Sequence, residues 1–161
     1  MRGIPAILRS IFISPEFLVV IAGVALACVF PRECIWISQR ISQQPELLKY
    51  AWLLPAGLVA YDLKVAKSIL FPDADKKMLL QGWQRYWELK SATTVGVLYG
   101  FGFAVAGLVT MAFDWKVPAS HQSATLLTAV IGAVAVAASL FYAQIRIEEL
   151  FREHNQTKSP R

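Results

Sequence analysis

The chain has 161 residues, of which 56% are apolar and 17% are charged, and its formal net charge is +5. Soluble domains carry about 25% charged residues, so this composition excludes an ordinary soluble protein. Two stretches, residues 91–113 and 122–145, contain no acidic or basic side chain. At ~1.5 Å per residue each is long enough to cross ~30 Å of hydrocarbon. The sequence therefore predicts a single all-α, polytopic transmembrane domain over residues 1–161, with about four spans, two strong and two short or kinked.

The first predicted span covers residues 15–33. Ser14 has the chemistry of a helix cap, Pro15 suits the first helical position, and Glu16 complements the positive end of the helix dipole. The apolar run ends at Pro31, so we expect a kink there, with the backbone continuing into residues 34–37.

Two further interpretations concern this N-terminal region. Residues 4–13 are expected to form an interfacial lead-in helix. A cleaved signal peptide is the competing interpretation of the first apolar run, but Glu16 interrupts the stretch where an uncharged core is needed. We therefore expect an uncleaved span.

The second predicted span, residues 46–62, is the weakest. Lys49 lies near one end and Pro55 removes a helical hydrogen bond near the centre. The segment is either a kinked crossing or half of a re-entrant hairpin with the first run. The crossing is favoured because Asp62, Lys64 and Lys67 follow and would anchor its cytoplasmic end.

Residues 62–90 form the main polar segment, predicted as two cytoplasmic helical pieces broken at residues 71–73. In the second piece, aromatic side chains are expected to share one face with leucines, bordered by basic residues, at the membrane–water boundary. The residues expected to bind lipid or a partner there are Lys76, Lys77, Trp83, Arg85, Tyr86 and Trp87.

The third and fourth spans carry small residues at four-residue spacing, which is typical of close helix contacts in membranes. The predicted packing residues are Ala92, Gly96, Gly100 and Ala104 in residues 91–113, and Thr128 and Gly132 in residues 122–145. These ridges either pack the two spans against each other or form a homo-oligomer interface. Both interpretations stay open at this point.

The basic residues indicate the orientation. With four crossings and both termini in the cytoplasm, twelve of the sixteen Lys and Arg residues are cytoplasmic and four are outside. Residues 146–161 are then a charged cytoplasmic helix. This arrangement predicts a multi-pass protein of a bacterial-type inner membrane and needs no nucleic-acid partner to explain the charge.

Charged residues are expected only near the ends of the spans: Glu16, Lys49 and Asp62 are explained there by capping or by side chains reaching the interface. No nucleophile elbow, phosphate loop or metal-ligand spacing occurs, so neither enzymatic activity, a cofactor nor a metal is expected. Cys28 and Cys34 are interpreted as free thiols.

We therefore expect a small membrane protein that acts through helix packing. It would be a homo-oligomeric pore-like or sensor subunit, or the membrane anchor of a cytoplasmic partner, as in stress, defence or immunity modules. The alternative is a subunit that binds lipid or a hydrophobic small molecule between its helices.

Overall fold

In a computed structural model the chain is a bundle of helices. The structure describes residues 14–43, 45–73, 80, 83, 86–112 and 119–158, and all regular structure within them is helical. This confirms the all-α prediction. The helices are α2 (Pro15–Val29), α3 (Pro31–Ser42), α4 (Pro45–Leu70), α6 (Tyr86–Ala112) and α7 (Ala119–Lys158). The predicted lead-in helix 4–13 and the loop of residues 114–118 lie outside the described residues.

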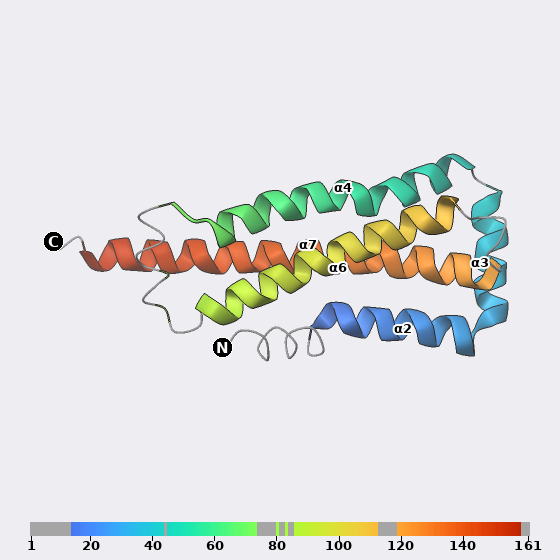
Figure 1. Cartoon of the computed structure of the whole chain (residues 1–161), viewed down its shortest axis with the longest axis horizontal. Coiled ribbons are helices and arrows are strands. Elements are labelled where there is room, and N and C mark those ends of the chain that lie inside the picture. Colours follow the sequence, from blue (N-terminus) through green and yellow to red (C-terminus); the bar gives the residue numbers. More distant parts are fainter. Residues whose placement is uncertain are drawn as a thin grey trace.

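Four helices run along the long axis of the molecule, and α3 crosses them at one end (Figure 1). Helix α7 packs against α2, α3, α4 and α6, and α4 also packs along α6. Figure 1 shows that α4 ends, α6 begins and α7 ends toward the same end of the bundle. The last turns of α7 extend beyond α4 and α6 at that end, which we call the α7 end.

The first helix begins as predicted and ends earlier. Ser14 caps α2, because its Oγ accepts a hydrogen bond from the Phe17 N–H at 3.2 Å. Pro31 disfavours helical geometry at Phe30, whose φ of −122° and ψ of 52° end the helix. The axes of α2 and α3 differ by 97°. The predicted kink at Pro31 is confirmed, and the backbone continues through it into α3, which lies across the end of the bundle.

The predicted polar segment 62–90 needs correction at both ends. Helix α4 continues without interruption past Pro55 and residue 62 and ends at Leu70, just before the predicted break at 71–73. Helix α6 begins at Tyr86, so residues 86–90 belong to the same helix as the third predicted span. Packing against α6 and α7 explains why α4 extends beyond its apolar stretch.

Two of the described helices are long and apolar enough to cross a membrane, over Tyr86–Thr110 and His121–Arg152. They coincide with the two strong predicted spans and are compatible with a helical membrane protein. The bent pair α2 and α3 makes a third candidate if both helices are counted as one broken span. Helix α4 has 26 residues, or ~39 Å, but its charged residues keep it out of this count.

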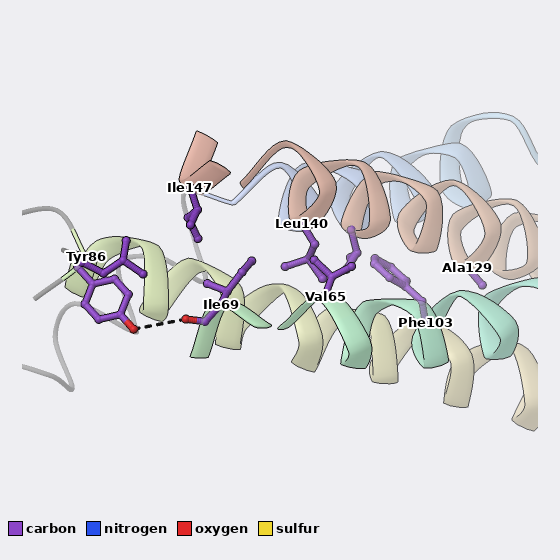
Figure 2. Packing of buried hydrophobic residues seen from close by; sticks show 9 residues of the cluster. Val65, Ile69, Tyr86, Phe103, Ala129, Leu140 and Ile147 are labelled. Carbon is purple, nitrogen blue, oxygen red and sulfur yellow. Dashed lines mark hydrogen bonds between the residues drawn. The ribbon is translucent and has the colours of Figure 1, made fainter. Parts of the chain in front are cut away.

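The core has large side chains toward the α7 end and small ones toward α3. Figure 2 shows Val65 and Ile69 of α4 among Tyr86, Leu140 and Ile147, with Tyr86 Oη donating to the Ile69 carbonyl at 3.4 Å. Toward α3, the buried residues of α7 are mostly small: Ala124, Ala129, Gly132 and Ala133. In lipid such small residues allow backbones to approach closely, which is a main source of helix association.

Candidate functional site

One acidic residue lies in the core. Helix α4 turns a stripe of buried residues toward α6 and α7, spaced alternately by four and three positions: Pro55, Val59, Asp62, Ala66 and Ile69. Asp62 occupies the middle of this stripe and is 1% exposed. Its neighbours Tyr61, Leu63 and Lys64 are exposed. Asp62 and Lys64 therefore lie on different faces of α4.

The carboxyl group of Asp62 fills the space that Gly100 leaves on α6. A Cβ atom on Gly100 would lie 3.1 Å from Asp62 Oδ2, 3.6 Å from Val136 Cγ1 and 3.8 Å from Val59 Cγ2. Both carboxyl oxygens are buried and neither has a hydrogen-bond partner. Three helices thus enclose an unpaired carboxyl group in apolar surroundings.

This group lies deep in the bundle. Gly100 is near the middle of the candidate span Tyr86–Thr110, and Val136 is near the middle of His121–Arg152. The expectation that Asp62 anchors the end of a span is therefore wrong. The charge pattern of Asp62, Lys64 and Lys67 suggested a helix end, whereas the continuous α4 carries Asp62 inward.

Chemically, such a group holds or releases a proton. An ionised carboxylate in a dry, unpaired position costs several kcal/mol, and the neutral acid costs much less. In membranes, buried ionisable residues mark ion or proton pathways more often than they mark structure. Asp62 is a candidate site residue that the search of the sequence for charge in the middle of a span missed.

A second polar position lies on the same face of α6. Thr93 is 2% exposed and its Oγ1 has no hydrogen-bond partner, whereas the hydroxyls of Thr94 and Thr110 donate to the carbonyl four residues earlier. Among the described residues, Thr93 Oγ1 and the two Asp62 oxygens are the buried side-chain polar atoms without a partner. Thr93 lines a cavity of about 260 Å³, which we call the Thr93 cavity.

Glu16 also lines the Thr93 cavity and is 4% exposed. Figure 1 shows that α2 begins part-way along α6 and α7, not level with their ends. Glu16 is therefore packed inside the bundle. Its place at the first turn of α2 still complements the helix dipole.

The predicted packing residues make contacts within the chain. Gly96 faces Leu140 and Val136 of α7, with its Cβ position 3.8 and 3.9 Å from them, and Gly100 faces α4 and α7. A Cβ on Gly132 would meet the ring of Phe103, and Thr128 meets Gly23 of α2. Ala104 is buried, and Ala92 is exposed along the Thr93 cavity. The Gly96–Gly100 ridge thus packs the helices of one chain.

The predicted aromatic face is divided. Tyr86 is buried and reaches Ile69, Trp83 is half-buried against the core, and Trp87 is 77% exposed. Adjacent residues of a helix point about 100° apart, so the start of α6 at Tyr86 turns Trp87 away from the core. Lys76, Lys77 and Arg85 lie outside the described residues.

An apolar groove of about 490 Å³ runs between α2, α6 and α7, and we call it the Gly102 groove. Gly23 and Ala27 of α2 line it opposite Gly102 and Ala106 of α6. A Cβ on Gly102 would meet nothing within 4 Å. The helices therefore leave open space on this side of the bundle.

Cys28 and Cys34 are free thiols, as predicted. Cys34 is buried where α3 meets α7, and its carbonyl accepts a hydrogen bond from Ser123 Oγ at 2.7 Å. Within the described part of the chain, no group of three His, Cys, Asp or Glu side chains could hold a metal ion.

Comparisons of the chain with protein-family models, curated proteins and solved structures return no match.

Proposed function

We propose that the protein is a multi-pass membrane subunit that works as a proton-responsive sensor through helix packing, without a catalytic role. The observation that supports this proposal is the unpaired, buried carboxyl group of Asp62 between α4, α6 and α7. With a proton bound, the carboxyl group is neutral and compatible with the apolar core. Without it, the packed arrangement must bear an uncompensated charge.

The size of this penalty suits a switch. The effective cost of an unpaired buried ion is several kcal/mol. A complete reversal of a two-state equilibrium, from 1:99 to 99:1, takes ~5.5 kcal/mol. Loss of one proton from Asp62 is thus sufficient to shift α4 away from α6 toward a looser arrangement in which water reaches the carboxylate.

A distance measurement tests this response. Spin labels on cysteines replacing Leu63 of α4 and Phe101 of α6, both exposed, report the separation of the two helices in lipid nanodiscs. The background carries Cys28→Ser and Cys34→Ser. We expect the distance distribution to broaden and lengthen as the pH rises. Asp62→Asn should abolish this change, since it keeps the shape and removes the ionisation.

The matched control is Asp73→Asn, which removes an exposed aspartate just beyond the end of α4. It should leave the pH response intact. An equal response in the Asp62→Asn variant would contradict the proposed sensor function.

We also propose four crossings, by α2, α4, α6 and α7, with both termini on the cytoplasmic side of an inner membrane. The alternating direction of the four long helices and the twelve-to-four division of basic residues support this orientation. Helix α3 would then lie in the outer interface, where exposed Trp36 and Arg40, stacked 5.4 Å apart, suit the headgroup region.

Cysteine labelling tests the four crossings. In the cysteine-free background, a cysteine replacing the exposed Arg32 should react with an impermeant thiol reagent in intact cells. A cysteine replacing Asp73 should react only after lysis. Labelling of both or neither from outside would contradict the orientation.

Anchoring of a cytoplasmic protein is the second candidate function. Two observations favour it: α7 extends beyond α4 and α6 (Figure 1), and its C-terminal part carries exposed charged residues, Arg146, Glu148, Glu149 and Arg152. Arg146 and Glu149 pair at 3.1 Å with both side chains in solvent, so they are free to exchange partners. Charge reversal at Glu148 and Arg152 should release a co-purifying partner and leave the pH response of the bundle unchanged.

Lipid binding and self-association are candidates for the Gly102 groove, because small residues line it and no side chain of the described residues fills it. Gly102→Leu tests both. Loss of a bound lipid from the native mass spectrum of the variant would support lipid binding in the groove. A lower mass of the variant complex in detergent would support a homo-oligomer.

A further inference from the structure

Among the described residues, the two core positions without a hydrogen-bond partner follow one face of α6: Thr93 belongs to that face, and Asp62 packs onto it from α4. Thr93, Gly96 and Gly100 are separated by three and four residues, which places them in line along the helix. Thr93 and Gly100 are ~10.5 Å apart along the axis, and Gly96 lies between them. Asp62 covers Gly100. The stripe therefore connects the hydroxyl of Thr93 with the carboxyl of Asp62 through two positions that lack side chains.

The Thr93 cavity reaches along this stripe. Leu89, Thr93 and Gly96 of α6 line it, as do Ser139 and Leu140 of α7 and Glu16 of α2. Its volume of about 260 Å³ holds several water molecules. It begins near the first turn of α6, toward the α7 end, and ends at Gly96, one turn or ~6 Å short of Gly100.

Two features suit this cavity to carry a proton. Thr93 Oγ1 is buried without a partner, so it is available to a water molecule in the cavity. Glu16 places a carboxyl group in the same wall. Between the cavity and Asp62 stand Val136 and Leu140, whose side chains touch the Gly96 position at ordinary contact distance. A route from the cavity to Asp62 therefore requires these two side chains to move aside.

We infer that Asp62 exchanges its proton with one side of the membrane only, through the Thr93 cavity. This inference rests on the proposed sensor function of Asp62. In the exchange, the O–H bond of Asp62 breaks and its electron pair stays on the carboxylate. The proton passes to water in the cavity, where Thr93 accepts and donates hydrogen bonds, and then through the Glu16 carboxylate to water at the α7 end.

The other titratable groups on the packed helices lie elsewhere. On α4, Tyr61, Lys64 and Lys67 are exposed. On α6, Tyr99 stacks on Phe103 and lines the Gly102 groove, and Glu88 and Lys90 lie in the first turns. On α7, Tyr142 is exposed, and the other ionisable residues nearest to Val136 along the chain are His121 and Arg146, toward opposite ends of the helix. Within the described residues, Glu16 is thus the charged group on the path between Asp62 and the α7 end.

Infrared spectroscopy of the reconstituted protein tests the route. The band of the protonated Asp62 carboxyl is assigned as the carboxylic-acid band that Asp62→Asn removes. Its shift in D₂O reports the exchange rate. Thr93→Val, which replaces the hydroxyl by a methyl group, should slow the exchange at least tenfold, and Glu16→Gln should also slow it. Both variants should keep the pH-dependent loss of the Asp62 band, whereas Asp62→Asn removes the band and its pH response.

Two glycine variants separate blocking of the cavity from a change in helix stability. Gly96→Ala adds a methyl group at the inner end of the cavity, at ordinary contact distance from its neighbours, and should slow the exchange. Gly102→Ala makes the same change on the open side of α6 and should not. Both variants are expected to fold.

The outcomes distinguish the two proposals. If Asp62→Asn removes no carboxyl band, the proposed sensor function fails, and the route fails with it. If the band is present but Thr93→Val, Glu16→Gln and Gly96→Ala all exchange at the wild-type rate, the route is overturned and the sensor function stands. Exchange that is slow in those variants and normal in Gly102→Ala supports the route.

Discussion

Gly100 and Gly102 lie two positions apart on α6 in opposite surroundings. A Cβ atom on Gly100 would lie 3.1 Å from a carboxyl oxygen of Asp62, whereas a Cβ on Gly102 would meet nothing within 4 Å. Gly100 belongs to the predicted row of small residues in α6, and Gly102 lies outside that row. The comparison teaches that small residues in a membrane helix serve either for close packing or for open space, and that only the partner across the gap decides which.

The largest effect is expected from leucine at these two positions. Gly100→Leu drives a side chain into Asp62, Val59 and Val136 and should lower the free energy of unfolding by at least ~3 kcal/mol. The leucine of Gly102→Leu points into the Gly102 groove and should change the free energy of unfolding by less than ~1 kcal/mol. Unfolding in detergent with a chemical denaturant measures both. Equal destabilisation would break the contrast between the two faces.

A double-mutant cycle sharpens the same comparison. Gly100→Ala alone should cost ~1–3 kcal/mol, because the new methyl group is 3.1 Å from Asp62 Oδ2. Combined with Asp62→Ala, the same change should cost almost nothing, which gives a coupling energy of ~1 kcal/mol or more. Gly96→Ala, whose neighbours are at 3.8 and 3.9 Å, is the control and should not couple to Asp62. If the effects of Gly100→Ala and Asp62→Ala are additive, the Asp62 carboxyl group does not occupy the space beside Gly100.

A smaller effect is expected at the start of α6, where two adjacent aromatic residues differ in burial. Tyr86→Phe removes the hydrogen bond from Oη to the Ile69 carbonyl and should cost ~0.5–1.5 kcal/mol. Trp87→Phe changes a side chain that is 77% exposed and should cost less than ~0.5 kcal/mol. Thermal unfolding measures the difference. A larger loss for Trp87 would mean that the membrane-facing side of α6 holds this end together.

Sequence reasoning predicted the strong spans because their signals are local. Ser14, Pro15 and Glu16 predicted the start of α2, and the uncharged residues 91–113 predicted α6. The direction of α3 was not predictable, because Pro31 fixes where a helix breaks and the packing of α3 on α7 fixes the angle.

Asp62 was misplaced because charge was counted along the chain without regard to helical phase. Lys64 and Lys67 lie on the exposed side of α4, while Asp62 shares the phase of Val59 and Ile69. That spacing was present in the sequence and could have identified Asp62 as a core residue. The depth of the carboxyl group was not predictable, since it depends on which turn of α6 and α7 packs against it.

The central claim is that Asp62 is an unpaired, proton-binding group of the bundle core. The most direct test is the thermal stability of the purified protein across pH, for the wild type and for Asp62→Asn. Ionised Asp62 would be an uncompensated charge in the packed core, so we expect the wild type to be most stable at low pH and to lose stability as the pH rises. Asp62→Asn should remove that loss. A variant that loses stability with pH as steeply as the wild type would contradict the account.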